Sequence, residues 1–118
     1  LFVRFAHCHL KCRYCDTTME SPDGQCHITR PDETLLRLPN PLTPAALTAA
    51  LLDCLGQTPH HSISFTGGEP LLYHRALRHV LPTLQPICQT YLETSGTQPD
   101  LLRPLLPWVD MVAMDVKL

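Results

Sequence analysis

The sequence predicts an α/β fold built on a parallel sheet, and two observations carry this prediction. Four strand-like runs alternate with helix-like segments, which implies right-handed crossovers between parallel strands. Polar motifs stand at the end of each run, where parallel sheets bind their ligands. Four such strands make either half of a (β/α) barrel or part of an open sheet.

The first third of the chain holds one strand and two irregular stretches. Residues 1–6 read as a strand, and residues 7–18 form a cysteine-rich loop. Residues 20–41 are polar, and we expect a variable insertion with little regular structure there. Four prolines interrupt this stretch: Pro22, Pro31, Pro39 and Pro41.

A helix and a strand occupy the middle of the chain. Thr43 is a good N-cap residue, and Pro44 suits the first position of a helix. Residues 45–55 continue this helix, which we expect Gly56 to stop. Residues 62–66 then alternate like a strand.

Two more helix–strand units complete the predicted fold. A helix is expected over residues 73–84, where Pro82 shortens or kinks it. Residues 87–93 form the third predicted strand, and residues 100–106 form a short, proline-flanked helix. Residues 111–116 are rich in apolar side chains, as a buried parallel strand should be.

Size and charge limit the classes of function. The 118 residues suffice for one small domain over residues 1–118, and 44% of them are hydrophobic. A net charge of -2 offers no basic field for nucleic acid. No apolar run reaches the ~20 residues of a membrane helix and no secretory leader is visible, so we expect no membrane contact and a cytoplasmic location. The chain lacks an initiator Met and has strand-like runs at both ends, so we expect a fragment truncated at both ends.

Three cysteines follow the first strand in the spacing C-x3-C-x2-C: Cys8, Cys12 and Cys15. Thiolates are soft ligands that suit iron–sulfur clusters and zinc. Three thiolates satisfy three irons of a four-iron cluster and leave the fourth iron open, which suits substrate binding.

Other interpretations of these cysteines stay open at this point. Cys26, followed by His27, would complete a four-ligand set for structural zinc. Disulfides and free thiols are two further alternatives, although a chain without a secretory leader favours metal or redox chemistry.

The cysteine motif resembles the signature of the radical S-adenosylmethionine (SAM) superfamily, C-x3-C-x-aromatic-C. Tyr14 fills the aromatic position, whose backbone in that superfamily lies near the adenine of SAM. The run Thr66-Gly67-Gly68-Glu69-Pro70 resembles the superfamily's Gly-Gly-Glu motif, which binds the amino group of SAM. Glycines let a ligand approach the backbone, and a carboxylate can accept hydrogen bonds from an ammonium group. A plain turn with a solvated Glu69 is the alternative.

The third and fourth strand ends resemble motifs of two kinds of radical SAM enzyme. Glu93 and Ser95 lie in a run similar to the Glu-Thr-Asn-Gly-Thr of 7-carboxy-7-deazaguanine synthases, where a carboxylate and hydroxyls suit a ribose diol. A turn whose hydroxyls bond their own backbone is the alternative. Asp115 and Lys117 resemble the Asp-x-Lys of glycyl-radical-enzyme activases, in which the Lys reaches the SAM carboxylate. A surface ion pair is the alternative here.

Residues beside the cysteines carry two further expectations. Cys15-Asp16-Thr17 resembles the same synthases, in which the Thr hydroxyl ligates Mg²⁺, so Thr17 is a candidate Mg²⁺ ligand. Oxygen ligands suit this ion, and capping of the next turn is the alternative. His7 and His9 depart from the usual Gly and Asn, and we expect them to be surface residues rather than ligands.

The resemblance implies a partial (β/α) barrel of the radical SAM type that holds a [4Fe-4S] cluster and SAM. It implies reductive cleavage of SAM to a 5′-deoxyadenosyl radical, which abstracts a substrate hydrogen. The favoured reaction is the Mg²⁺-assisted ring contraction of 6-carboxytetrahydropterin by a lyase of queuosine biosynthesis. The implied partners are this pterin-like substrate and an electron donor such as flavodoxin or ferredoxin, and a homodimer is a candidate assembly. The alternative functions are a glycyl-radical-enzyme activase and a non-catalytic zinc-binding module.

Overall fold

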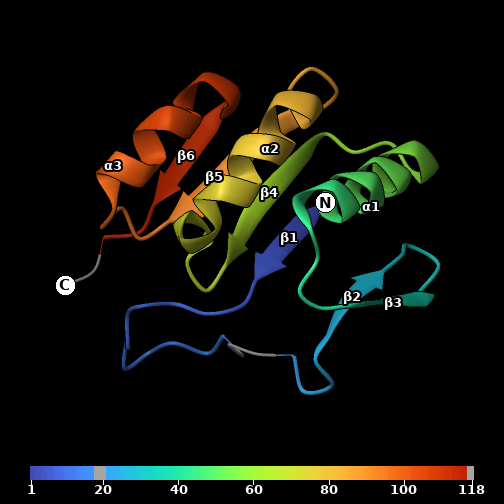
Figure 1. Ribbon diagram of the computed structural model, residues 1–118, viewed down its shortest axis with the longest axis horizontal. Coiled ribbons are helices and arrows are strands. Elements are labelled where there is room, and N and C mark those ends of the chain that lie inside the picture. The colour runs from blue at the N-terminus through green and yellow to red at the C-terminus, as the bar shows by residue number, and fades with distance from the viewer. Residues whose placement is uncertain (18–20, 117–118) are drawn as a thin grey trace.

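A computed structural model of the chain describes residues 1–17 and 21–116. Four parallel strands form one sheet in the order β1-β4-β5-β6 (Figure 1). They are β1 (Phe2–Phe5), β4 (Ser62–Gly67), β5 (Gln89–Thr94) and β6 (Met111–Met114). The α/β fold with a parallel sheet that the sequence predicts is therefore confirmed.

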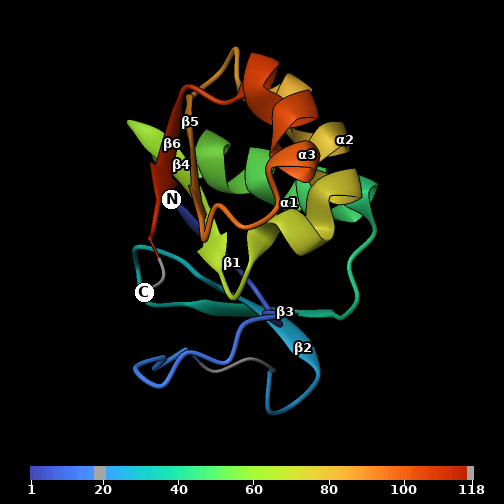
Figure 2. The ribbon, with the colours of Figure 1, turned by 90° about the vertical axis from the view of Figure 1, so that its left-hand side faces the viewer.

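The helices cover one face of this sheet, as Figure 2 shows. They are α1 (Pro44–Gln57), α2 (His74–Leu84) and the short α3 (Pro99–Leu102). The core lies between the two layers, and burying each large apolar side chain contributes roughly 1.5–3 kcal/mol. Its fully buried members are Ile63, Phe65, Leu71, Leu77, Val80, Leu81, Leu84, Leu92 and Leu105.

Local sequence signals set the ends of α1, with one correction. The Thr43 side chain accepts a hydrogen bond from the Ala46 amide at 3.1 Å, as an N-cap does, and Pro44 is the first residue of the helix. Gly56 does not stop the helix, which continues to Gln57. The prediction failed because Gly56 does not adopt the left-handed conformation that ends a helix, and a glycine in a helical conformation is tolerated in the last turn.

Short 3₁₀ turns adjoin two of the helices that the sequence predicts. The 3₁₀ turn η1 (Pro70–Tyr73) precedes α2, whose end at Leu84 agrees with the prediction. Only Pro99–Leu102 of the third helical segment is α-helical, and the 3₁₀ turn η2 (Arg103–Trp108) follows it. Prolines supply no amide hydrogen, so closely spaced prolines favour short 3₁₀ turns over a regular helix.

The fourth predicted strand is shorter and more exposed than expected. It ends at Met114, and as the last strand of the sheet it pairs only with β5 among the described strands. More than half of the Met111 and Met114 side-chain surfaces stays exposed. Its apolar composition is equally typical of a buried central strand, which is why the sequence prediction was wrong.

The expectation of little regular structure over residues 20–41 is also wrong. This segment contains an antiparallel hairpin of β2 (Gln25–Thr29) and β3 (Leu35–Pro39). The prolines stand in the turns or at the strand ends, where a missing amide hydrogen costs no ladder hydrogen bond. The tip is closed by the Arg30 amide, which donates to the Thr34 carbonyl at 3.0 Å.

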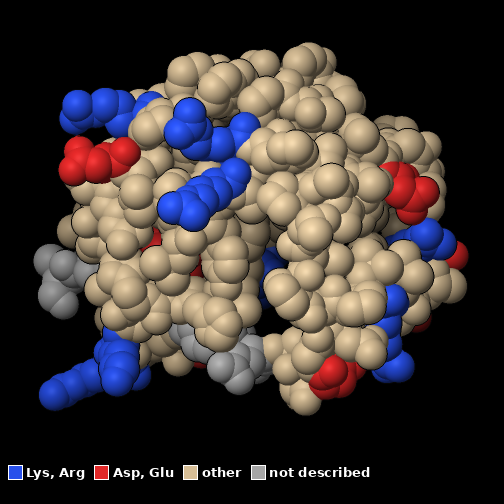
Figure 3. Space-filling model, viewed as in Figure 1, with Lys and Arg blue, Asp and Glu red and all other residues tan. Residues whose placement is uncertain are grey.

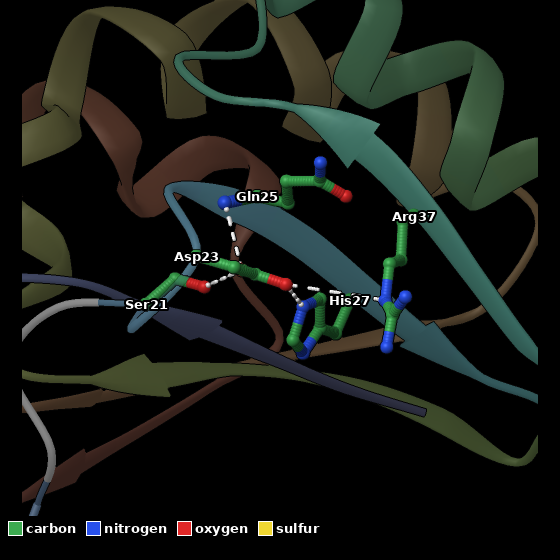
Figure 4. A network of polar contacts seen from close by, with 5 residues as sticks. All are labelled: Ser21, Asp23, Gln25, His27 and Arg37. Atoms are coloured by element: carbon green, nitrogen blue, oxygen red, sulfur yellow. Dashed lines mark hydrogen bonds and ion pairs between the residues drawn. The ribbon is translucent and has the colours of Figure 1, made fainter.

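A polar network around Asp23 holds the base of the hairpin (Figure 4). The Ser21 hydroxyl and the Gln25 amide donate to Oδ1 of Asp23 at 2.8 and 3.1 Å. Nε2 of His27 lies 2.8 Å from Oδ2, and Nε of Arg37 lies 3.9 Å from the same oxygen. The hydrogen bonds from Ser21 and His27 lower the pKa of Asp23 from 3.8 to about 2.

The structure shows the lengths of the helices and the distribution of charge on one face of the molecule. Within residues 1–17 and 21–116, every helix is too short or too polar to cross a membrane. Figure 3 shows Lys and Arg side chains in separate groups with uncharged surface between them.

Lowering the pH should loosen the base of the hairpin. Because the pKa of Asp23 is depressed on folding, its stabilising contribution is complete above pH 3.8 and is lost as the pH falls through about 2. The amide chemical shift of Gln25, followed by NMR between pH about 1.5 and 6, should titrate with a midpoint near 2. The matched control Asp23→Asn should show no such titration. A Gln25 shift that ignores pH in the wild-type chain contradicts this account.

Candidate functional site

A cavity of about 510 Å³ opens at the carboxyl edge of the parallel sheet. It is lined by the cysteine loop and by the residues that end β4, β5 and β6. Its lining includes the following sequence-predicted site residues: Cys8, Cys12, Tyr14, Cys15, Thr17, Gly67, Gly68, Glu69, Glu93, Ser95 and Asp115. The remaining predicted residue, Lys117, lies outside the described residues.

The three thiols reach this cavity from one loop after β1. The Cys15 amide donates to the Cys12 carbonyl at 3.2 Å, and the Leu10 amide donates to the sulfur of Cys8 at 3.4 Å. Across the described residues, no three His, Cys, Asp or Glu side chains already stand in metal-binding geometry. The loop therefore brings the thiols to one cavity without gathering them around a single point.

Close backbone packing sets the path of this loop over the end of β4. The Gly68 amide donates to the Phe5 carbonyl at 3.0 Å, and the Glu69 amide donates to the His7 carbonyl at 2.9 Å. A Cβ atom on Gly68 would lie 1.9 Å from the His7 oxygen, so only glycine fits. His7 itself has a φ of 67°, a left-handed conformation that few non-glycine residues adopt.

Glu69 is buried, and its carboxylate accepts four hydrogen bonds. Oε1 accepts from the Leu71 amide at 3.0 Å and from the Thr94 hydroxyl at 2.7 Å. Oε2 accepts from the amide and the hydroxyl of Ser95 at 2.9 and 2.7 Å. Burial raises the pKa of Glu69, but the hydrogen bonds from Ser95, Thr94 and Leu71 outweigh it and bring the pKa below its usual value.

The end of β5 supplies a second carboxylate and a set of hydroxyls. The Thr66 hydroxyl donates to Oε2 of Glu93 at 3.1 Å, and the Glu93 side chain is exposed to the cavity mouth. The hydroxyl oxygens of Ser95 and Thr97 lie 2.9 Å apart, and Nε2 of His9 lies 2.9 Å from the Thr97 oxygen. His9 thus connects the cysteine loop to the turn after β5.

Oxygen-bearing residues near the cysteines and at the end of β6 complete the lining. Asp16 and Thr17 line the cavity directly after Cys15. Asp115 follows β6, and its amide donates to the Thr94 carbonyl at 2.9 Å. These side chains offer the hard oxygen donors that suit Mg²⁺, without forming a complete cage among the described residues.

The other three cysteines lie away from the cavity. Cys26 stands on β2, where burial and the neighbouring Cys54 of α1 raise the pKa of its thiol. Cys26 is not part of the lining that Cys8, Cys12 and Cys15 share, so the arrangement does not favour Cys26 as a fourth ligand. Cys88 is buried in the core, and Cys54 is half-buried.

Sequence reasoning missed the supporting role of two threonines. Thr94 is buried and donates to Glu69, and Thr66 donates to Glu93. Both stand in motifs that were recognised, but the hydrogen bonds join residues 25 and 27 positions apart in the chain. The sequence pattern that could have indicated the contact between Thr66 and Glu93 is the alternation of buried and exposed positions along β4 and β5, which places both side chains on one face of the sheet.

The donor set and the cavity fit an iron–sulfur cluster with an organic cofactor beside it. Three thiols from one loop match the ligand type and number for a four-iron cluster with one open iron. The space beside them lies within the range of small-molecule cofactor pockets, roughly 300–1,000 Å³. The glycine pair and the polar turn after β5 add backbone and hydroxyl groups that can hold polar atoms of a ligand.

Comparisons with known proteins show what the chain is similar to in sequence. The model of the radical SAM superfamily matches residues 2–117. The chain is similar to a 7-carboxy-7-deazaguanine synthase of Geobacter sulfurreducens, with 37% identity over 100% of the chain and 49% of the relative. A protein of the same name from Thermococcus kodakarensis is 32% identical over 99% of the chain and 48% of its own length. Another from Methanothermobacter thermautotrophicus is 34% identical over 100% of the chain and 41% of its own length. The chain thus spans about half the length of these relatives or less, and no solved structure matches it significantly.

A methyl group at Gly68 should disrupt the site. Gly68→Ala forces a Cβ against the His7 carbonyl, and we expect it to destabilise the apoprotein by about 1–3 kcal/mol in urea unfolding. Gly56→Ala is the matched control, since a Cβ there meets nothing within 4 Å and alanine favours a helix by up to about 1 kcal/mol. Equal stability of Gly68→Ala and wild type would show that the loop does not pack on Gly68.

Proposed function

The chain belongs to the radical SAM superfamily, and from this premise we propose that it acts as a 7-carboxy-7-deazaguanine synthase. One observation carries the proposal: three thiols, a glycine pair and a polar turn from three strand ends line a single cavity. The name shared by the reported relatives favours this activity over a glycyl-radical-enzyme activase. The cavity lining and the position of Cys26 favour it over a zinc module.

Within this proposal each part of the cavity has a distinct task. Cys8, Cys12 and Cys15 hold the [4Fe-4S] cluster, whose role with SAM is to supply a 5′-deoxyadenosyl radical that takes a hydrogen atom from the substrate. The backbones of Tyr14 and the Gly67–Gly68 turn border the nucleoside and methionine parts of SAM. Glu93, Ser95 and Asp115 offer polar atoms to its ribose and amino-acid groups. The protein positions and shields the reactants, and the cofactors carry the chemistry.

The open face of the sheet is the proposed place of the pterin-like substrate. Arg4 on β1 pairs with Thr66 on β4, whose hydroxyl donates to Glu93 on β5. Their chain neighbours Val3, Phe65 and Leu92 belong to the core or pack against it, so alternation places these three polar positions on the opposite face of the sheet, and Arg4 is exposed. A guanidinium binds a carboxylate through paired hydrogen bonds, so Arg4 suits the carboxylate of 6-carboxytetrahydropterin.

Further components complete the proposed reaction. Thr17 contributes one oxygen ligand to Mg²⁺, and the substrate supplies others, as is usual for an ion that keeps few protein ligands. An electron donor of the flavodoxin or ferredoxin class delivers the electron that SAM cleavage consumes. A homodimer in the cytoplasm remains the proposed assembly.

Removing the thiols one at a time tests the cluster ligands. We expect the chain, reconstituted anaerobically with iron and sulfide, to be brown and to absorb near about 400 nm. The variants Cys8→Ala, Cys12→Ala and Cys15→Ala should lose most of the bound iron, because a cluster with two protein thiolates is weakly held. Cys26→Ala is the matched control and should keep it. Loss of iron in Cys26→Ala together with its retention in Cys8→Ala would overturn the ligand assignment.

The substrate proposal predicts a separable effect at Arg4. Wild-type protein with SAM, dithionite, Mg²⁺ and 6-carboxytetrahydropterin should form 7-carboxy-7-deazaguanine, detected by mass spectrometry. Arg4→Gln should raise KM for the pterin roughly 10- to 100-fold, the loss expected for a hydrogen bond to a charged group, with bound iron unchanged. Arg75→Gln, on the exposed surface of α2, is the control. An unchanged KM in Arg4→Gln contradicts the role of Arg4, and absence of product from the wild type contradicts the synthase activity.

A further inference from the structure

We infer that Glu69 is a positioning residue, which fixes the cysteine loop and the turn after β5 relative to each other and does not itself bind the ammonium group of SAM. The inference rests on the proposed function, since it concerns the same cavity. It departs from the role that the resemblance to the Gly-Gly-Glu motif implies for this side chain.

The first argument is the hydrogen-bonding capacity of the carboxylate. An ionised carboxylate has two oxygens and about four lone-pair sites. The structure fills all four, two on Oε1 with Leu71 and Thr94 and two on Oε2 with the amide and hydroxyl of Ser95. An ammonium group would therefore have to displace one of these donors, and the displaced donor would lose its partner in a buried place.

The second argument is the position of Glu69 between two loops. Its backbone amide donates to the carbonyl of His7, directly before Cys8. Its side chain reaches Ser95, from which hydroxyl contacts continue through Thr97 to His9, directly after Cys8. Both neighbours of the first proposed cluster ligand are thus connected to one carboxylate, by two different routes.

The third argument is burial. Glu69 is only 1% exposed, and a carboxylate is stable at such a place only when its charge is compensated by hydrogen bonds or ions. All four donors come from residues that end or follow a strand of the sheet or begin η1. The negative charge therefore draws the turn after β5 and the start of η1 together, and any change in it shifts the lining of the cavity.

Hydrogen exchange of the apoprotein tests the positioning role without any cofactor. Glu69→Gln replaces one acceptor oxygen by an NH₂ group that faces a backbone amide. The backbone amides of residues 69 and 95 should therefore exchange with solvent about tenfold faster than in the wild type. The exposed hairpin-turn variant Glu33→Gln is the control and should leave both amides unchanged. Exchange in Glu69→Gln equal to that of the wild type overturns the inference.

Binding measurements distinguish positioning from direct contact. The probes are SAM and 5′-methylthioadenosine, which keeps the nucleoside and lacks the amino-acid group. With reconstituted protein, Glu69→Gln should raise both Kd values by a similar factor of about ten, because the whole polar turn moves. A rise confined to SAM would indicate a direct ammonium contact and overturn the inference. A purely structural defect would reduce the number of binding sites and leave their Kd unchanged, which would overturn it as well.

Ser95→Ala provides a second, milder variant in case Glu69→Gln folds poorly. It removes the hydroxyl that donates to Oε2 and keeps the backbone amide. Its effects on exchange and on both Kd values should be smaller than those of Glu69→Gln and should not add to them in the double variant. Additive effects would show that Glu69 does not act through Ser95.

A wild type without cluster or SAM affinity would refute the proposed function alone, since hydrogen exchange of the apoprotein would still decide the role of Glu69.

Discussion

Contact between the chain after β1 and the glycine turn after β4 is the constraint on which the site depends. Gly68 lies so close to His7 that no side chain fits between them, and the next residue donates its amide to the same carbonyl. The buried carboxylate of Glu69 then connects this contact to the turn after β5. Three loops that are distant in sequence are thereby held around one cavity, and the thiols reach it through the first of them.

Much of this arrangement follows from local patterns in the sequence. Alternating runs located all four parallel strands within a few residues, and motifs at their ends gave nearly all described residues that line the cavity. The hairpin over residues 25–39 was missed because its prolines, which stand in turns and at strand ends, resemble those of an irregular segment. The exposure of β6 was missed because edge and central strands share one composition.

The role of Glu69 shows a different limit of sequence reasoning. A glutamate after two glycines indicates a ligand-binding turn, and the cavity lies where that pattern predicts it. Three of the four donors to its carboxylate, however, come from residues 94 and 95, and no local sequence pattern indicates that pairing. Hydrogen bonds between separate strand ends depend on register, and register is set by the whole sheet. The motif thus predicts the position of the ligand-binding turn, but it does not predict which groups the Glu69 carboxylate binds.

The central proposal is that the thiols of one loop would hold an iron–sulfur cluster in the cavity that the glycine turn and the turn after β5 also line. The electron paramagnetic resonance spectrum of the reconstituted, dithionite-reduced chain tests it most directly, recorded with and without SAM. A reduced four-iron cluster should give a signal whose shape changes on addition of SAM, because an iron without a protein thiolate would be open to SAM. A signal that saturating SAM leaves unchanged, or the lack of any reduced-cluster signal, would contradict the account.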